Sequence, residues 1–183
     1  MIPLFIEQNY ILLIKNGRDR VMTKSNHFNQ YVLKKCLIGD GMINGIINAI
    51  IFYFAEKGHI HTKTFAVGDI VKDLAFTSLI LGCILAAIVL PLTLKDVKKG
   101  KISVQEGTNK IANIMPNKKG LAYIVVGLLT MVVTASIAWL VATIIPTPLT
   151  VMQMMVFKGV MCAIAGASAA YMTIMTTVYK FAK

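Results

Sequence analysis

Four long apolar segments dominate the sequence and limit what the chain can fold into. They cover residues 33–55, 74–94, 120–145 and 151–179. An α-helix needs about 20 residues to cross a hydrocarbon core of about 30 Å. Backbone polar groups in lipid are satisfied only in helices or closed barrels, and these segments lack the period-two alternation of a barrel strand. The sequence therefore predicts an all-α membrane protein, with four transmembrane helices in an antiparallel bundle over residues 33–180.

The composition agrees with a lipid environment. Hydrophobic residues make up 56% of the chain, charged residues only 15%, and the mean hydropathy is +0.69. A soluble domain of this size has too much surface relative to its volume to hide so many apolar side chains. We therefore expect the lipid bilayer to be the main partner of the chain.

The lysine and arginine residues are distributed unevenly between the connecting segments. One set precedes or enters the first apolar segment, joins the second to the third, or follows the fourth: Lys15, Arg18, Arg20, Lys24, Lys34, Lys35, Lys95, Lys98, Lys99, Lys101, Lys110, Lys118, Lys119, Lys180 and Lys183. The other connections hold only Lys57, Lys63, Lys72 and Lys158. Because basic residues concentrate on the cytoplasmic side, this pattern predicts a multi-pass protein of the cell membrane with both termini cytoplasmic.

The net charge of +11 raises the question of nucleic-acid binding. A nucleic-acid-binding domain carries its basic residues as a patch or within a known motif. Here they lie between apolar segments, so we expect no nucleic-acid partner. The charge instead suits loops that face an anionic leaflet.

A stripe of polar residues lies in the first apolar segment. Asp40, Asn44 and Asn48 are each four residues apart and share one helix face. A carboxylate in a membrane helix costs about 2.5–3.5 kcal/mol on insertion scales. One interpretation is a polar track for a proton, an ion or a small solute. The other is hydrogen bonding between helices that sets their packing.

Lys158 is the other charged candidate inside an apolar segment. If the fourth helix begins near Leu149, Lys158 lies well inside the membrane and could pair with Asp40. If the helix begins near Phe157, the long side chain of Lys158 would extend to the outer interface. All four segments also carry Gly, Ala or Ser at intervals of four residues, a pattern typical of closely packed membrane helices or subunits. We therefore also expect a partner within the membrane, either further copies of the chain in a homo-oligomer or another membrane protein.

No catalytic, cofactor or metal motif appears. The sequence contains no GxSxG, P-loop, HExxH or CxxC pattern, and it predicts neither an enzyme nor a cofactor site. His59 and His61, with Glu56, Asp69 and Asp73 nearby, have spacings that match no standard metal site, so an exposed polar loop is expected there. The three cysteines are odd in number and predict no disulfide framework.

Two further segments carry local signals. Between the second and third apolar segments, Ser103 and Glu106 fit a capping box. The residues that follow on one helical face predict a short amphipathic helix ending at Pro116, with a solvated basic loop as the alternative: they are Val104, Thr108, Ile111, Ala112 and Met115. Residues 1–32 are interpreted as an N-terminal cytoplasmic leader. The Gly and Arg codons just before Met22 could form a ribosome-binding site, so translation could begin at Met22.

Three short motifs carry a resemblance. They are Met115-Pro116-Asn117-Lys118-Lys119-Gly120, Pro146-Thr147-Pro148-Leu149-Thr150 and Phe157-Lys158-Gly159. As a set, they resemble a group of small four-helix bacterial integral membrane proteins. The resemblance implies an integral membrane protein of a Gram-positive-type bacterium, and it implies no activity and no functional residue.

Two functions follow as expectations. The first is a transport or permease-like component that uses the face of Asp40, Asn44 and Asn48, together with Lys158. Polar residues inside a membrane usually mark such a pathway. The alternative is an accessory or interaction subunit that stabilises or regulates a membrane partner complex.

Overall fold

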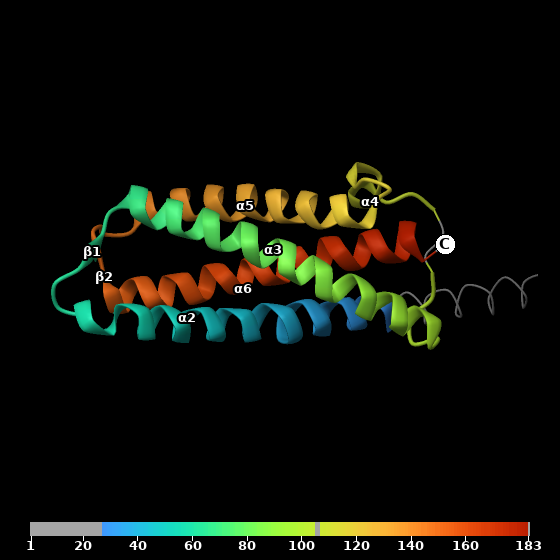
Figure 1. Cartoon of the computed structure of the whole chain (residues 1–183), viewed down its shortest axis with the longest axis horizontal. Coiled ribbons are helices and arrows are strands. Elements are labelled where there is room, and N and C mark those ends of the chain that lie inside the picture. The colour runs from blue at the N-terminus through green and yellow to red at the C-terminus, as the bar shows by residue number, and fades with distance from the viewer. Residues whose placement is uncertain (1–26, 105–106, 183) are drawn as a thin grey trace, which may run out of the picture.

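The computed structural model of the chain describes residues 27–104 and 107–182. The suggested start at Met22 and most of the predicted leader over residues 1–32 lie outside these residues. Four helices of the described part are long and apolar enough to cross a membrane. The predicted all-α fold with four such helices is confirmed (Figure 1).

The first long helix is helical from His27 to His59 and changes geometry along its length. It contains a π-helical stretch, η1 (Lys34–Met42), followed by α2 (Ile43–Glu56) and a final 3₁₀ turn, η2 (Lys57–His59). The other three are α3 (Val67–Lys98), α5 (Lys119–Ile144) and α6 (Val151–Thr176), and α6 continues into the π-helical η3 (Thr177–Phe181).

Two of these helices begin at polar caps that hydropathy alone does not indicate. In α3, the Ala66 backbone N–H donates to Asp69 Oδ2 at 3.3 Å, so the helix starts at Val67 and extends beyond the predicted 74–94 at both ends. In α6, Thr150 and Gln153 form a reciprocal capping box, which places the start at Val151. Lys158 is therefore two turns inside α6.

The middle connection contains a shorter helix than the one predicted. The helix α4 covers only Lys110–Ile114. Gly107 has a φ of +102°, a backbone conformation that does not occur within an α-helix. Asn109 caps α4 by accepting from the backbone N–H groups of Ile111 and Ala112. The expected capping box at Ser103 and Glu106 lies partly outside the described residues, because these exclude Glu106.

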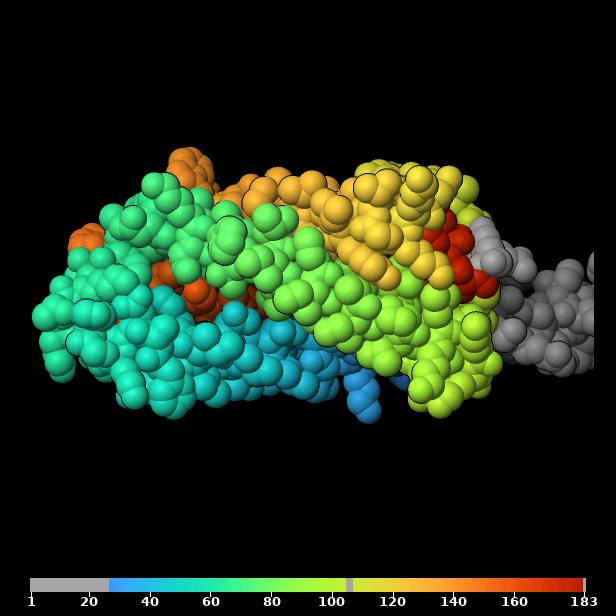
Figure 2. All heavy atoms as spheres, viewed as in Figure 1, coloured from blue at the N-terminus to red at the C-terminus, as the bar shows by residue number. Residues whose placement is uncertain are grey.

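The helices pack in an order that differs from their order in the chain. Helix α3 lies along α5, α2 lies along α6, and α6 also contacts α3 and α5. In the space-filling view, atoms of α6 are visible between those of α2 and α3 (Figure 2). The last helix is therefore in contact with each of the other three.

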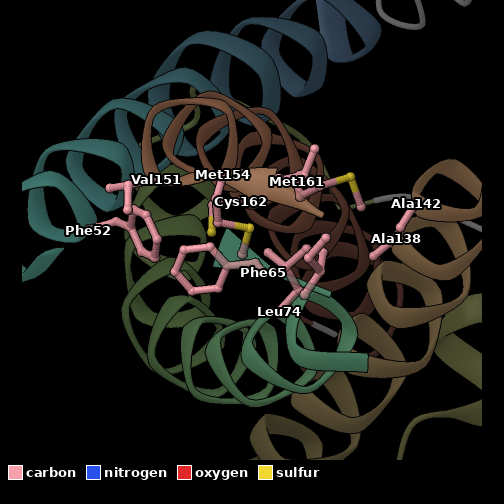
Figure 3. Close-up of a cluster of buried hydrophobic side chains, with 11 residues drawn as sticks. Phe52, Phe65, Leu74, Ala138, Ala142, Val151, Met154, Met161 and Cys162 are labelled. Atoms are coloured by element: carbon pink, nitrogen blue, oxygen red, sulfur yellow. The ribbon is translucent and has the colours of Figure 1, made fainter. Parts of the chain in front are cut away.

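A two-residue ladder joins the connections at one end of the molecule. Strand β1 (Thr64–Phe65) pairs antiparallel with β2 (Leu149–Thr150), with Thr64 opposite Thr150. The opposite end carries α4 and the C-terminus (Figure 1). Phe65 of the ladder belongs to a buried apolar cluster that also contains Phe52, Leu74, Met154 and Met161 (Figure 3).

Candidate functional site

The polar stripe of the first long helix packs toward α6. Asp40, Asn44 and Asn48 are all half-buried. The Asn44 amide donates to the Asp40 backbone carbonyl at 2.5 Å, and the Asn48 amide donates to the Asn44 carbonyl at 2.9 Å. In both bonds the acceptor is a backbone carbonyl four residues earlier in the same helix. The two amide groups therefore stabilise the first long helix itself and make no bond to another helix in the part of the chain that the structure describes. The Asp40 side chain differs, because its Oδ2 atom is buried and has no hydrogen-bond partner among the described residues.

Small residues bring the stripe close to α6. A Cβ atom added to Gly45 would lie 2.6 Å from the Gly159 carbonyl oxygen and 2.9 Å from Ala163 Cβ. A Cβ added to Gly166 would lie 2.5 Å from the Asp40 carbonyl oxygen. The two backbones are therefore in direct contact, as expected for small residues at a membrane-helix interface.

Lys158 lies in a different place from Asp40 and does not pair with it. Asp40 faces Gly166, whereas Lys158 is about 12 Å nearer the start of α6 at about 1.5 Å per residue. Lys158 Nζ instead binds Asp73 of α3, at 2.9 Å from Oδ1 and 2.7 Å from Oδ2. It also lies 5.1 Å from the centre of the Phe52 ring in α2. The Lys158 side chain is 11% exposed, so one ammonium group links three helices.

The acidic residues near His59 and His61 have other partners. Glu56 pairs with Lys63 at 2.5 Å, Asp69 caps α3, and Asp73 binds Lys158. His59 and His61 are exposed. Within residues 27–104 and 107–182, no three His, Cys, Asp or Glu residues gather closely enough to hold a metal ion.

A polar cluster near the other end was not predicted. The Tyr31 hydroxyl donates to Asp96 Oδ2 at 2.8 Å, and Lys35 Nζ donates to the Tyr31 hydroxyl at 3.0 Å. Lys35 and Lys101 also pair with Asp96, at 3.5 Å and 3.4 Å. The only signal in the sequence is an isolated acid among lysines. The cluster fixes the start of the first long helix against the end of α3.

An apolar groove lies between α5 and α6, and we call it the α5–α6 groove. Its volume is about 730 Å³. Its floor is formed by Leu149 and Met161, which are 4% and 2% exposed. The walls and the mouth are formed by Ile137, Val141, Ile145, Pro146, Met152, Gln153, Val156, Phe157, Val160 and Ile164.

The groove opens sideways and covers only part of the helix length. Val156 and Val160, on the rim, are 59% and 54% exposed. Closer to α4, Met115, Val126 and Ala169 belong to a buried cluster together with Leu85 and Ala86 of α3. No pattern in the sequence indicates the groove, because an apolar segment does not reveal where two helices separate.

Comparison of the chain with protein-family models, curated proteins and solved structures finds no match. The fold itself defines the class. Four long apolar helices indicate a multi-pass membrane protein.

Proposed function

We propose that the chain is a multi-pass protein of the cell membrane, an antiparallel bundle with both ends in the cytoplasm. The support is the placement of charge along the long axis. The end with α4 and the C-terminus carries Lys34, Lys35, Lys95, Lys98, Lys99, Lys101, Lys110, Lys118, Lys119 and Lys180. The end with the β1–β2 ladder carries Lys57, Lys63 and Lys72, close to Glu56, Asp69 and Asp73. This asymmetry matches the positive-inside rule.

We further propose that the chain is an accessory interaction protein. It would bind an apolar partner from the side, inside the bilayer. The α5–α6 groove is the observation that carries this proposal. A concave apolar hollow of several hundred Å³ is the usual form of a binding site, and this one opens toward the lipid phase. The Asn44 and Asn48 amides, by contrast, are bonded within their own helix.

Site-directed photo-crosslinking tests this proposal. A diazirine amino acid placed at Val160, on the groove rim, is expected to give one discrete adduct in native membranes. The same amino acid at Val132 is the matched control, because Val132 is 56% exposed on α5 and does not line the groove. Identical adduct patterns at the two positions, or no discrete adduct at Val160, would contradict lateral binding in the groove.

A second candidate, a transport or permease-like component, is favoured by the Asp40 carboxyl group. A buried carboxylate oxygen without a hydrogen-bond partner is costly and marks sites where a proton or cation is exchanged. In this proposal, Asp40 would bind the transported species, with Asn44 and Asn48 beside it. Flux into proteoliposomes should then be lost in Asp40→Asn, and flux that survives this change would count against transport.

A further inference from the structure

The length of the α5–α6 groove along the helix axis limits which ligands can fit in it. Its polar mouth lies at Gln153, and its far end lies at Ile164. The rise between these residues is about 16 Å at about 1.5 Å per residue, close to half of a hydrocarbon core of about 30 Å. The groove therefore covers the depth of one leaflet.

A transmembrane helix of a partner fits this shape poorly. Such a helix crosses both leaflets, whereas the lining of the groove on α6 extends only as far as Ile164. A single acyl chain occupies one leaflet only. It can also enter through the open side of the groove while the rest of the lipid stays in the bilayer.

The mouth of the groove offers one polar group at the depth of a lipid ester. Thr150 donates two hydrogen bonds to Gln153 Oε1, from its backbone nitrogen at 2.9 Å and from its hydroxyl at 3.1 Å. These bonds occupy the amide oxygen, so the amide nitrogen remains as a hydrogen-bond donor. An ester carbonyl accepts such a bond, whereas the floor at Leu149 and Met161 offers only apolar contact.

We propose that the α5–α6 groove binds one acyl chain of a bilayer phospholipid from the leaflet on the side of the β1–β2 ladder, with Gln153 at its ester region. This inference rests on the proposed lateral binding and names the class of partner.

Fluorescence quenching by brominated phospholipid tests the proposal in the full-length protein. The chain has one tryptophan, so Trp139→Phe gives a silent background. A reporter is introduced as Met152→Trp, at the groove mouth. The depth-matched control is Ile144→Trp, because Ile144 is 75% exposed near the same end of α5 and does not line the groove. Each protein is purified in detergent and titrated with phosphatidylcholine brominated on its acyl chains.

We expect quenching of the groove reporter to saturate near one lipid per protein, while the control is quenched only gradually as the lipid-to-detergent ratio rises. Val160→Phe adds volume at a residue that lines the groove, so it should shift the reporter titration to higher lipid. Superimposed titrations of reporter and control would overturn the acyl-chain proposal. If they superimpose while Val160 still crosslinks to one protein, lateral binding stands and only the acyl chain is excluded. If both experiments fail, the proposed function fails as well.

Discussion

At the scale of single residues, Lys158 shows how a charge is accommodated inside a membrane helix. Its ammonium group contacts the Asp73 carboxylate and lies over the Phe52 ring, so both partners come from other helices. A buried ammonium group that loses its counter-charge is left with an uncompensated desolvation cost. We therefore expect a large loss of stability when only one member of the Lys158–Asp73 pair is substituted.

The Asp73→Asn substitution is predicted to destabilise the protein. Removing one member of a fully buried pair costs about 3–5 kcal/mol. We expect about 2 kcal/mol here, because the Asp73 side chain is 37% exposed. The protein is heated in detergent, and size-exclusion chromatography then measures the fraction that remains folded. Adding Lys158→Met to Asp73→Asn should restore most of the loss.

The pair of Glu56 and Lys63 supplies the control for that prediction. The Lys63 side chain is 45% exposed, so Glu56→Gln should change stability by less than about 1 kcal/mol. Equal losses in Glu56→Gln and Asp73→Asn would show that burial does not distinguish the two pairs.

At the scale of elements, the contact between the first long helix and α6 depends on the absence of side chains. Gly45 lies against Gly159 and Ala163, while Gly39, six residues earlier, has nothing within 4 Å of a Cβ placed on it. The two glycines thus differ in packing although they belong to one continuous helix. A single added methyl group should therefore lower stability at Gly45 but not at Gly39.

The Gly45→Ala substitution is predicted to push α2 away from α6 and to lower stability by about 1–3 kcal/mol, the usual cost of overpacking. Gly39→Ala should be neutral or slightly stabilising, because alanine favours helix over glycine. Thermal unfolding of both variants in the same detergent makes the comparison. A Gly39→Ala loss as large as that of Gly45→Ala would remove the packing explanation.

The short helix α4 is held by a side chain from the end of the chain. Lys180 Nζ donates to the carbonyl oxygens of Met115 and of Ala112, the latter at 3.4 Å. We predict that Lys180→Met loosens α4. A loss of about 1.5 kcal/mol, typical of a charged hydrogen bond, corresponds to about tenfold faster amide exchange in residues 110–115. Lys110→Met, at an exposed lysine of α4 itself, should leave exchange unchanged, and a similar effect in both variants would contradict a specific role for Lys180.

At the scale of the whole molecule, the long axis separates a lysine-rich end from a mixed one. This asymmetry predicts the side from which each connection is reached. Thr62→Cys, in the α2–α3 connection, should react with a membrane-impermeant thiol reagent on intact cells. Lys118→Cys, before α5, should react only after permeabilisation. The three native cysteines lie within the helices that can span the membrane and serve as the background. Labelling of Lys118→Cys on intact cells would reverse the proposed orientation.

The helices, but not their contacts, could be predicted from the sequence. A run of about 20 apolar residues identifies a spanning helix by itself, which is why the four helices were found. The partner of Lys158 lies 85 positions away, and nothing local distinguishes Asp73 from Asp40 as that partner. The α4 boundary was missed for a local reason, because the positive φ of Gly107 is a property of the folded loop. The groove depends on where α5 and α6 diverge, which no single segment encodes.

The position of α6 also constrains how the protein is assembled. Helix α6 touches each of the other three long helices, yet it leaves the ribosome after all of them. The glycine-lined face of the first long helix therefore lacks its contact with α6 until α6 has been synthesised. Maturation is thus a late event for this protein, and a nascent chain stopped before Val151 would expose that face to other membrane proteins and to quality-control proteases.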